Sequence, residues 1–236
     1  MLRKLLVVAL AVVALAACSS AGEGAALPAG PDLMRQAAEA MKTVKSAAFS
    51  IATEGKPNVP VKKADGRLTA EGDADGTITL EVFGNLQEVS FMLIGDKVHF
   101  KGPTGGYQEM TRQQLAQLYD PSLILDPAKG IPGLLATAAD PLVRAEEDGA
   151  YRVDVAFTGQ ALSTLVPGVT EGVNGTVWVD RASSRLTKVL LQLREGTVTV
   201  SFADYDAPVT ITPPPSSSSS SAPSSPASSS PASSAG

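Results

Sequence analysis

Hydrophobic residues near the start of the chain recur at helical spacing. From Pro31 onward, apolar positions such as Leu33 and Ala37 repeat every three to four residues, which predicts a helix over residues 31–45. Proline is tolerated in the first turn of a helix, and the carboxylate of Asp32 is favoured there by the helix dipole. The pattern therefore predicts one amphipathic helix at the start of the domain.

Beyond this helix the hydrophobic period changes to strict alternation. Phe49 and Ile51, for example, alternate with smaller or polar neighbours, a pattern typical of a strand with one dry and one wetter face. Short turns such as Asp148-Gly149 separate these segments, so neighbouring strands should form hairpins in an antiparallel sheet. We expect strands at residues 49–52, 67–71, 77–82, 89–94, 97–101, 151–157, 173–180, 186–194 and 197–202.

The middle of the chain departs from the strand pattern. Thr111 and Gln114 have the spacing of a capping box, in which each side chain satisfies a backbone group at the start of a helix. Three Xaa-Pro pairs between residues 120 and 132 then interrupt the chain, because each proline restricts the preceding residue to extended geometry. Residues 111–135 are therefore expected to form short apolar helices that need cover, with a further short helix at 160–165.

The N-terminal residues have the charge and hydropathy order of a secretory signal. Two basic residues precede an apolar run over residues 5–15, which is shorter than the about 20 residues that a membrane-spanning helix needs. The sequence Leu15-Ala16-Ala17-Cys18 resembles the lipobox of bacterial lipoproteins, in which the cysteine receives a diacylglyceryl group. We therefore expect residues 1–17 to be a signal peptide that is removed. Lipidated Cys18 would then hold the protein at the extracytoplasmic face of the cell membrane.

Composition divides the rest of the chain into three parts. Residues 18–30 are mostly small and are expected to be a tether. Residues 31–212 contain neither a Pro-rich linker nor an internal repeat and have the size of one domain. Residues 213–236 are almost only Ser, Pro and Ala, which cannot bury enough apolar surface to fold, so a disordered tail is expected. Glycosylation of this tail is left open.

Charge and side-chain chemistry argue against several classes of function. Loss of the two basic residues of the signal peptide leaves 24 acidic and 17 basic residues, a net charge of −7, which argues against a nucleic-acid partner. His99 is the only histidine and Cys18 the only cysteine, so no metal site, disulfide, catalytic set or cofactor is expected. The acids at 146–148 lead into a glycine turn and are not spaced as a calcium loop. A hydrolase therefore has the least support.

The order of these parts resembles the LppX/LprAFG family of actinobacterial lipoproteins, most closely its LprG type. The resemblance covers about residues 30–210 and includes no catalytic signature, and the Ser/Pro tail is not part of the family pattern. The stretches that carry it are residues 32–46, Tyr119-Asp120-Pro121, Leu125-Asp126-Pro127 through Leu135, and Thr176-Val177-Trp178-Val179 leading to the strand at 186–193.

The resemblance implies an α+β fold in which a curved antiparallel β half-barrel has helices on its concave face, similar to the LolA and LolB carriers of Gram-negative bacteria. Such a fold would enclose a cavity for acyl chains. Members of the family look like carriers that move lipids or glycolipids across the cell envelope, some of them with a major-facilitator transporter. The expected partners are therefore the membrane through Cys18, a lipid or glycolipid ligand, and a transporter of that class.

The residues themselves support a cavity less directly. Residues 92–94 and 189–191 are apolar on both faces of their strands, so helices, a ligand or ordinary core must cover both faces. Aromatic residues make up only 5% of the chain, and short aliphatic side chains can leave space that rings would fill. The alternative is a surface scaffold lipoprotein with a filled core that binds partners through its acidic face and tail. The expected cavity lining is Phe49, Ile51, Leu80, Val82, Phe91, Leu93, Leu125, Leu134, Val155, Val177 and Leu190.

Overall fold

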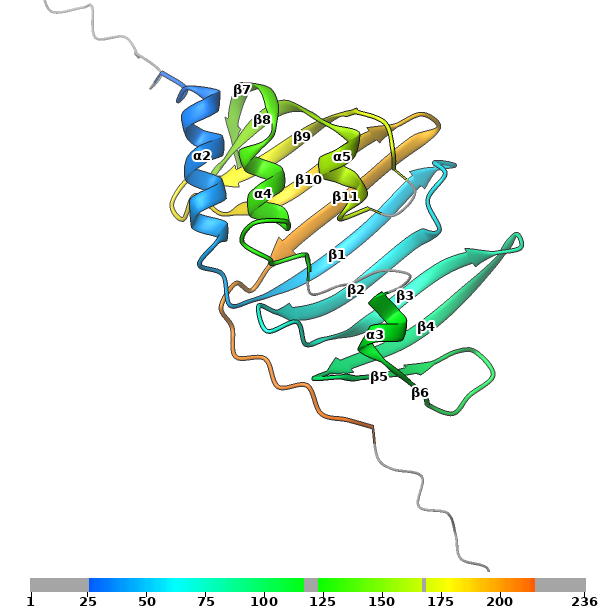
Figure 1. Cartoon of the computed structure of the whole chain (residues 1–236). Helices are drawn as coiled ribbons and strands as arrows, with labels where there is room; N and C mark the ends of the chain where they lie inside the picture. Colours follow the sequence, from blue (N-terminus) through cyan, green and yellow to red (C-terminus); the bar gives the residue numbers. More distant parts are fainter. Residues whose placement is uncertain (1–25, 117–122, 167–168, 215–236) are drawn as a thin grey trace, which may run out of the picture.

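Eleven strands form one antiparallel sheet in the computed structural model, which describes residues 26–116, 123–166 and 169–214. The order across the sheet is β6-β5-β4-β3-β2-β1-β11-β10-β9-β8-β7, so the β1–β11 pair alone joins strands that are distant in sequence. This pair connects the N-terminal and C-terminal hairpins into one curved, open sheet (Figure 1). The strands are β1 (Ser46–Gly55), β2 (Val61–Thr69), β3 (Ala74–Val82), β4 (Asn85–Ile94), β5 (Lys97–Lys101), β6 (Gln108–Thr111), β7 (Ala139–Glu147), β8 (Ala150–Phe157), β9 (Val173–Asp180), β10 (Leu186–Leu193) and β11 (Gly196–Ala203).

The helices lie on one face of this sheet, as expected for a half-barrel with helices on its concave side. Helix α2 packs against α4 and β7, and α4 also touches α5, so these three helices cover the strands β7 to β11 (Figure 1). Helix α3 lies apart from them, against β5 and β6. The helices are α2 (Gly30–Met41), α3 (Arg112–Ala116), α4 (Ile131–Ala136) and α5 (Gly159–Ser163).

Helix α2 forms where the hydrophobic period predicts it, although it ends at Met41 and not at residue 45. Proline lies in its first turn together with an acidic side chain, as the preference for helix starts requires. Its apolar stripe, which includes Leu33, Ala37 and Met41, is almost completely buried. Full burial of a Leu or Met side chain contributes roughly 1.5–3 kcal/mol, so this stripe fixes the helix on the sheet.

Two strands were absent from the prediction. Strand β6 has only four residues, and β7 contains Asp140 and Pro141, which break the alternation. Strand β7 lies at an edge of the sheet, where a missing backbone N–H is tolerated. Its register against β8 also shifts between Ala139 and Leu142, so a bulge accommodates the proline.

The predicted capping box is confirmed. The backbone N–H of Thr111 donates to Oε1 of Gln114 at 2.8 Å, and the backbone N–H of Gln114 donates to Oγ1 of Thr111 at 3.2 Å. Of the predicted helical run, Leu123 lies in a 3₁₀ helical turn, Ile124 and Leu125 form a turn, and the next helix is α4. The signal peptide, Cys18, Tyr119-Asp120-Pro121 and nearly all of the Ser/Pro tail lie outside the described residues.

Candidate functional site

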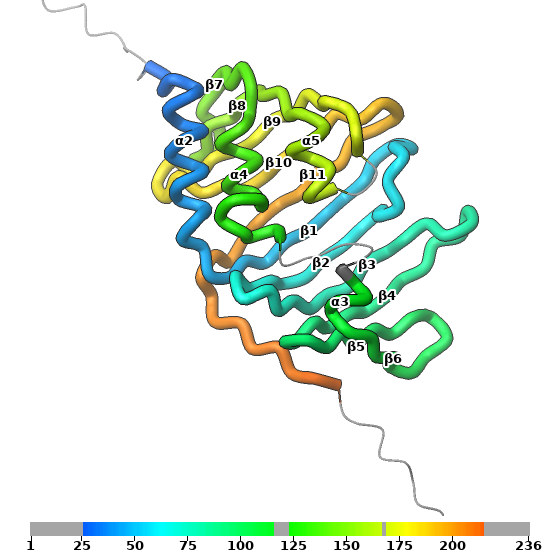
Figure 2. Tube along the Cα trace, viewed as in Figure 1, coloured from blue at the N-terminus to red at the C-terminus, as the bar shows by residue number. Residues whose placement is uncertain are grey.

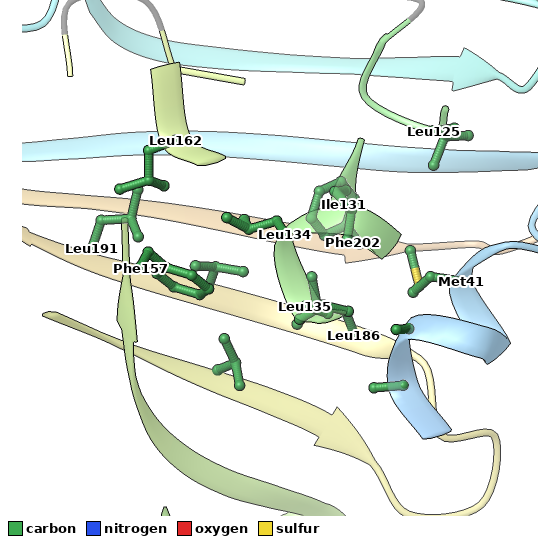
Figure 3. Packing of buried hydrophobic residues seen from close by; sticks show 14 of the residues in the cluster. Met41, Leu125, Ile131, Leu134, Leu135, Phe157, Leu162, Leu186, Leu191 and Phe202 are labelled. Atoms are coloured by element: carbon green, nitrogen blue, oxygen red, sulfur yellow. The ribbon is translucent and has the colours of Figure 1, made fainter. Parts of the chain in front are cut away.

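The strand register divides the side chains into an inner face toward the helices and an outer face. On the inner face, β7 to β11 form what we call the covered half, where side chains from α2, α4 and α5 fill the space above the sheet (Figure 3). Leu135 of α4, Leu162 of α5 and Val153 of β8 are each 0% exposed. Interiors packed at this density leave little space for a ligand.

The inner face of β1, β3, β4 and β5 is different, and we call it the open apolar face. Toward the β3–β4 turn its residues are hydrophobic but only partly buried or exposed, whereas Leu93 and Val98 at the other end of these strands are buried. Of the described helices, α3 lies against β5 and β6 in this part of the sheet. Along the inner positions of β3, exposure rises from 3% at Ala74 to 41% at Val82. The open apolar face consists of Phe49, Ile51, Ile78, Leu80, Val82, Val89, Phe91 and Phe100.

Two glycines lie in the middle of the open apolar face. The register places Gly66 opposite Phe49 and Gly76 opposite Phe91, with the two glycines paired to each other. A Cβ atom built on Gly66 would lie 2.9 Å from Cε1 of Phe49, so the phenyl ring lies over the glycine. Neighbouring strands are about 4.8 Å apart, so roughly 14 Å separates the strand of Phe49 from the strand of Phe91. At the two positions between them, Gly66 of β2 and Gly76 of β3, the sheet has no side chain.

Five of the predicted lining residues belong to the open apolar face, namely Phe49, Ile51, Leu80, Val82 and Phe91. The others are buried in the hydrophobic core, except for one on the outer face. The buried ones are Leu93, Leu125, Leu134, Val155 and Val177. Sequence reasoning missed Ile78, Val89 and Phe100, which the alternation in their strands could have identified.

The prediction that Leu190 lines a cavity is wrong. Leu190 pairs with Thr176 and Thr199, which lie on the outer face, whereas its neighbour Val189 shares the inner face with Val177. Strict alternation from buried Leu186 would place Leu190 on the inner face. A register shift between Leu186 and Lys188 reverses the alternation, so Leu190 faces outward. A bulge changes which side chains face the core beyond it.

Two shallow hollows lie on the outer face of the described sheet. One of them is bordered by Trp178, whose ring is covered by the ammonium group of Lys188 at 3.7 Å. The other lies beside Leu86 and Lys101. Neither of these two hollows lies between the sheet and the helices, and an enclosed cavity there stays a prediction.

Ionisable groups of the described residues are mostly used in surface ion pairs. His99 lies on the outer face of β5, with its Nδ1 atom 3.8 Å from Glu109. Of the acidic run before the β7–β8 turn, Glu146 pairs with Arg181, and Glu147 accepts from Nε1 of Trp178 at 3.2 Å. Among residues 26–116, 123–166 and 169–214, no three His, Cys, Asp or Glu side chains gather where they could hold a metal ion.

None of the helices in the described ranges is long and apolar enough to cross a bilayer.

The family model for the LppX_LprAFG lipoprotein matches residues 29–211. This chain belongs to the LppX_LprAFG lipoprotein family. It is 30% identical over 227 residues to the lipoarabinomannan carrier protein LprG of Mycolicibacterium hassiacum, covering 86% of this chain and 93% of the relative. It is 28% identical to lipoprotein LprA of Mycobacterium tuberculosis, covering 86% and 92% of the two chains.

Solved structures of the same family share the fold. The crystal structure of LprF from Mycobacterium bovis superimposes with a TM-score of 0.70 at 19% identity, covering 78% of this chain and 96% of LprF. The crystal structure of LppX from Mycobacterium tuberculosis gives a TM-score of 0.60 at 20% identity, covering 78% of this chain and all of LppX. The half-barrel expected from the resemblance is therefore confirmed, while the likeness to LolA and LolB stays a prediction.

Proposed function

We propose that this protein is a lipid carrier that holds the acyl chains of a lipid or glycolipid against its open apolar face and moves them across the cell envelope. The observation that carries the proposal is the set of half-buried hydrophobic residues on the inner face of β1, β3, β4 and β5. A soluble domain rarely leaves such residues uncovered without a binding role. The name of the LprG relatives, lipoarabinomannan carrier protein, supports an amphipathic ligand of this class.

The free energy of acyl-chain transfer agrees with a carrier that binds its lipid without an external energy source. A 16-carbon chain that leaves water gains on the order of 12 kcal/mol, at about 0.8 kcal/mol per methylene. A lipid in a bilayer already has this gain, so exchange between bilayer and protein is close to balanced. Direction must then come from a partner or from a concentration difference, and a major-facilitator transporter is the partner class we propose.

The anchor is the second part of the proposal. Lipidated Cys18 would hold the protein at the extracytoplasmic face of the cell membrane, with residues 18–30 as its tether. Two acyl chains hold a protein on a bilayer far more durably than one, because every buried methylene adds to the binding free energy. The carrier would thus act beside the membrane from which it takes its ligand.

Lipid extraction tests this function. A secreted form with Cys18→Ser is purified from an actinobacterial host, and its lipid content is measured after extraction with organic solvent. We expect about one lipid per protein. In the variant with Ile78→Asn and Leu80→Asn, two unpaired amides would face the acyl chain, each at a cost of about 2 kcal/mol, so lipid recovery should fall at least tenfold.

The matched control is Thr77→Asn with Thr79→Asn, which places the same amides on the outer face of the same strand. This variant should retain the lipid of the parent protein. If the parent protein is itself free of lipid, the carrier function is contradicted.

A surface scaffold lipoprotein is the alternative function. The filled covered half and the charged hollow beside Trp178 on the outer face favour it. A lipid-free protein, in which both double variants behave as the parent does, would support the scaffold.

A further inference from the structure

Two hairpin turns of this protein share one backbone conformation but have different chemistry. Phe83 and Gly84 have φ values of 49° and 77°, and Asp148 and Gly149 have φ values of 52° and 78°. Turns with two positive φ values favour Asn-Gly or Asp-Gly, and a bulky residue there is strained. The β7–β8 hairpin thus has the preferred turn sequence, whereas the β3–β4 hairpin has a phenylalanine in its place.

Packing does not explain this phenylalanine. The side chain of Phe83 is 100% exposed, and its neighbours Leu86 and Val82 are 66% and 41% exposed. A strained, fully exposed aromatic residue on a turn contributes nothing to the core. Strain that the fold does not use is a reason to look for a function at that position.

Four of the six large exposed hydrophobic residues in the described ranges lie at one end of the sheet. In the described ranges, large exposed hydrophobic side chains lie at the end with the β3–β4 turn and the β5–β6 loop, or beside the start of α2. The turns at the opposite end, residues 70–73, 95–96, 148–149 and 181–185, have none of them. The exposed residues are Leu27, Val82, Phe83, Leu86, Tyr107 and Leu142.

Helix α2, which follows the N-terminal tether, begins beside the start of β7, on the side of the molecule away from the β3–β4 turn (Figure 1). Gly30, the first residue of α2, lies against the backbone of Pro141, near the start of β7. The first residue of β7, Ala139, pairs with Ala156 near the end of β8. Helix α2 then runs to the end of the sheet opposite the β3–β4 turn, where β1 begins at Ser46. The segment after β11 leaves from that opposite end, so the N-terminal and C-terminal segments depart on different sides of the molecule (Figure 2).

The length of the tether allows the domain to turn the end with the β3–β4 turn toward a bilayer. Eleven residues separate Cys18 from Gly30, and the twelve residue steps between the two span at most about 40 Å when extended. The apolar turn is also much too small for a stable protein interface, which buries about 800 Å² on each partner. A few apolar side chains are instead sufficient to enter the boundary between lipid headgroups and acyl chains.

We propose that the Phe83 turn, with Val82 and Leu86, inserts into the surface of the bilayer that holds the anchor and forms the entrance through which an acyl chain reaches the open apolar face. The second part of this inference, the entrance for the acyl chain, rests on the proposed carrier function. The inner residues of β3 connect the two sites, because Val82 is followed inward by Leu80 and Ile78. The acyl chain would therefore meet apolar side chains along β3, beside Asn85 and Gln87, which share the inner face on β4.

Fluorescence quenching tests the insertion. The acylated full chain is reconstituted into phosphatidylcholine vesicles whose acyl chains carry bromine, and tryptophan is introduced as Phe83→Trp or, in the matched turn, as Asp148→Trp. After subtraction of the signal of Trp178 in the parent protein, we expect Trp at position 83 to lose at least half of its fluorescence. Trp at position 148 should lose less than a tenth.

A second variant separates insertion from folding. Phe83→Asn creates the preferred Asn-Gly turn, so the hairpin should be at least as stable as in the parent protein. Transfer of a fluorescent phospholipid between vesicles should nevertheless slow about tenfold, with unchanged lipid content in the purified protein. Asp148→Phe should leave the transfer rate unchanged.

The outcomes are distinguishable from a failure of the carrier function. Equal quenching at positions 83 and 148, or an unchanged transfer rate in Phe83→Asn, overturns the inserted turn even if the protein carries lipid. Strong quenching at position 83 supports it even if the purified protein is free of lipid, a result that would contradict the carrier function alone.

Discussion

The covered half and the open apolar face are built from the same kind of strand, yet helices cover only the first of them completely. In both, hydrophobic residues occupy alternate positions and point to the side of the helices. Over β7 to β11 the helices α2, α4 and α5 complete a core, whereas over β1, β3 and β4 the same pattern remains partly uncovered. Alternation therefore tells which face is apolar, and the placement of helices decides whether that face is core or binding surface.

The largest expected effect is a difference in stability between two leucines. Leu135→Ala leaves a cavity in the covered half and should lower the free energy of unfolding by about 3 kcal/mol. Leu80→Ala on the open apolar face should lower it by less, by about 1 kcal/mol, because that side chain is only partly buried. Urea unfolding measures both, and equal losses would contradict the distinction between the two regions.

Adding volume tests the same comparison in the opposite direction. Val177 is 0% exposed, so Val177→Trp overpacks the core and should cost about 1–3 kcal/mol or more. Val82→Trp should change stability by less than about 0.5 kcal/mol, since surface positions tolerate substitution. Should Val82→Trp abolish folding, as judged by circular dichroism, Val82 would belong to the packed core.

The smallest effect concerns acid stability at the end opposite the Phe83 turn. The backbone N–H of Lys45 donates to Oδ1 of Asp206 at 2.8 Å, and this bond, followed by Arg185, lowers the pKa of the Asp206 carboxyl below its ordinary value. A carboxyl with a lowered pKa in the folded state contributes stability above its unfolded pKa of about 4 and loses it as pH falls further.

Asp206→Asn should therefore be less stable than the parent protein at pH 7 and should lose less stability between pH 5 and pH 2. Unfolding by urea at several pH values measures the two slopes. Parallel slopes would show that Asp206 does not contribute to the pH dependence.

Much of the fold could be predicted because it depends on local patterns. The strands at 97–101 and 173–180 were predicted with their observed bounds, and the capping box of Thr111 and Gln114 is present. Strand β7 could not be predicted in this way, since Pro141 is compatible with a strand only at a sheet edge, and an edge is a property of the whole topology.

The candidate site was harder to predict than the fold. Phe49 and Phe91 were placed on the correct face, but Leu134 and Val155 have the same apolar character and are core. The difference depends on where α4 and α5 lie, which no local pattern contains. Leu190 was misplaced because one bulge reversed the alternation within its strand.

The course of the last described segment has a practical consequence. Ser46 donates from Oγ to the carbonyl of Ala207 at 2.7 Å, which fixes the chain beside the start of β1 before the Ser/Pro sequence begins. A reporter or affinity label fused beyond this contact would follow a segment that leaves the sheet at the end opposite the Phe83 turn. Such a fusion leaves the Phe83 turn unobstructed, so labelled protein is suitable for single-molecule imaging of its encounters with a supported bilayer.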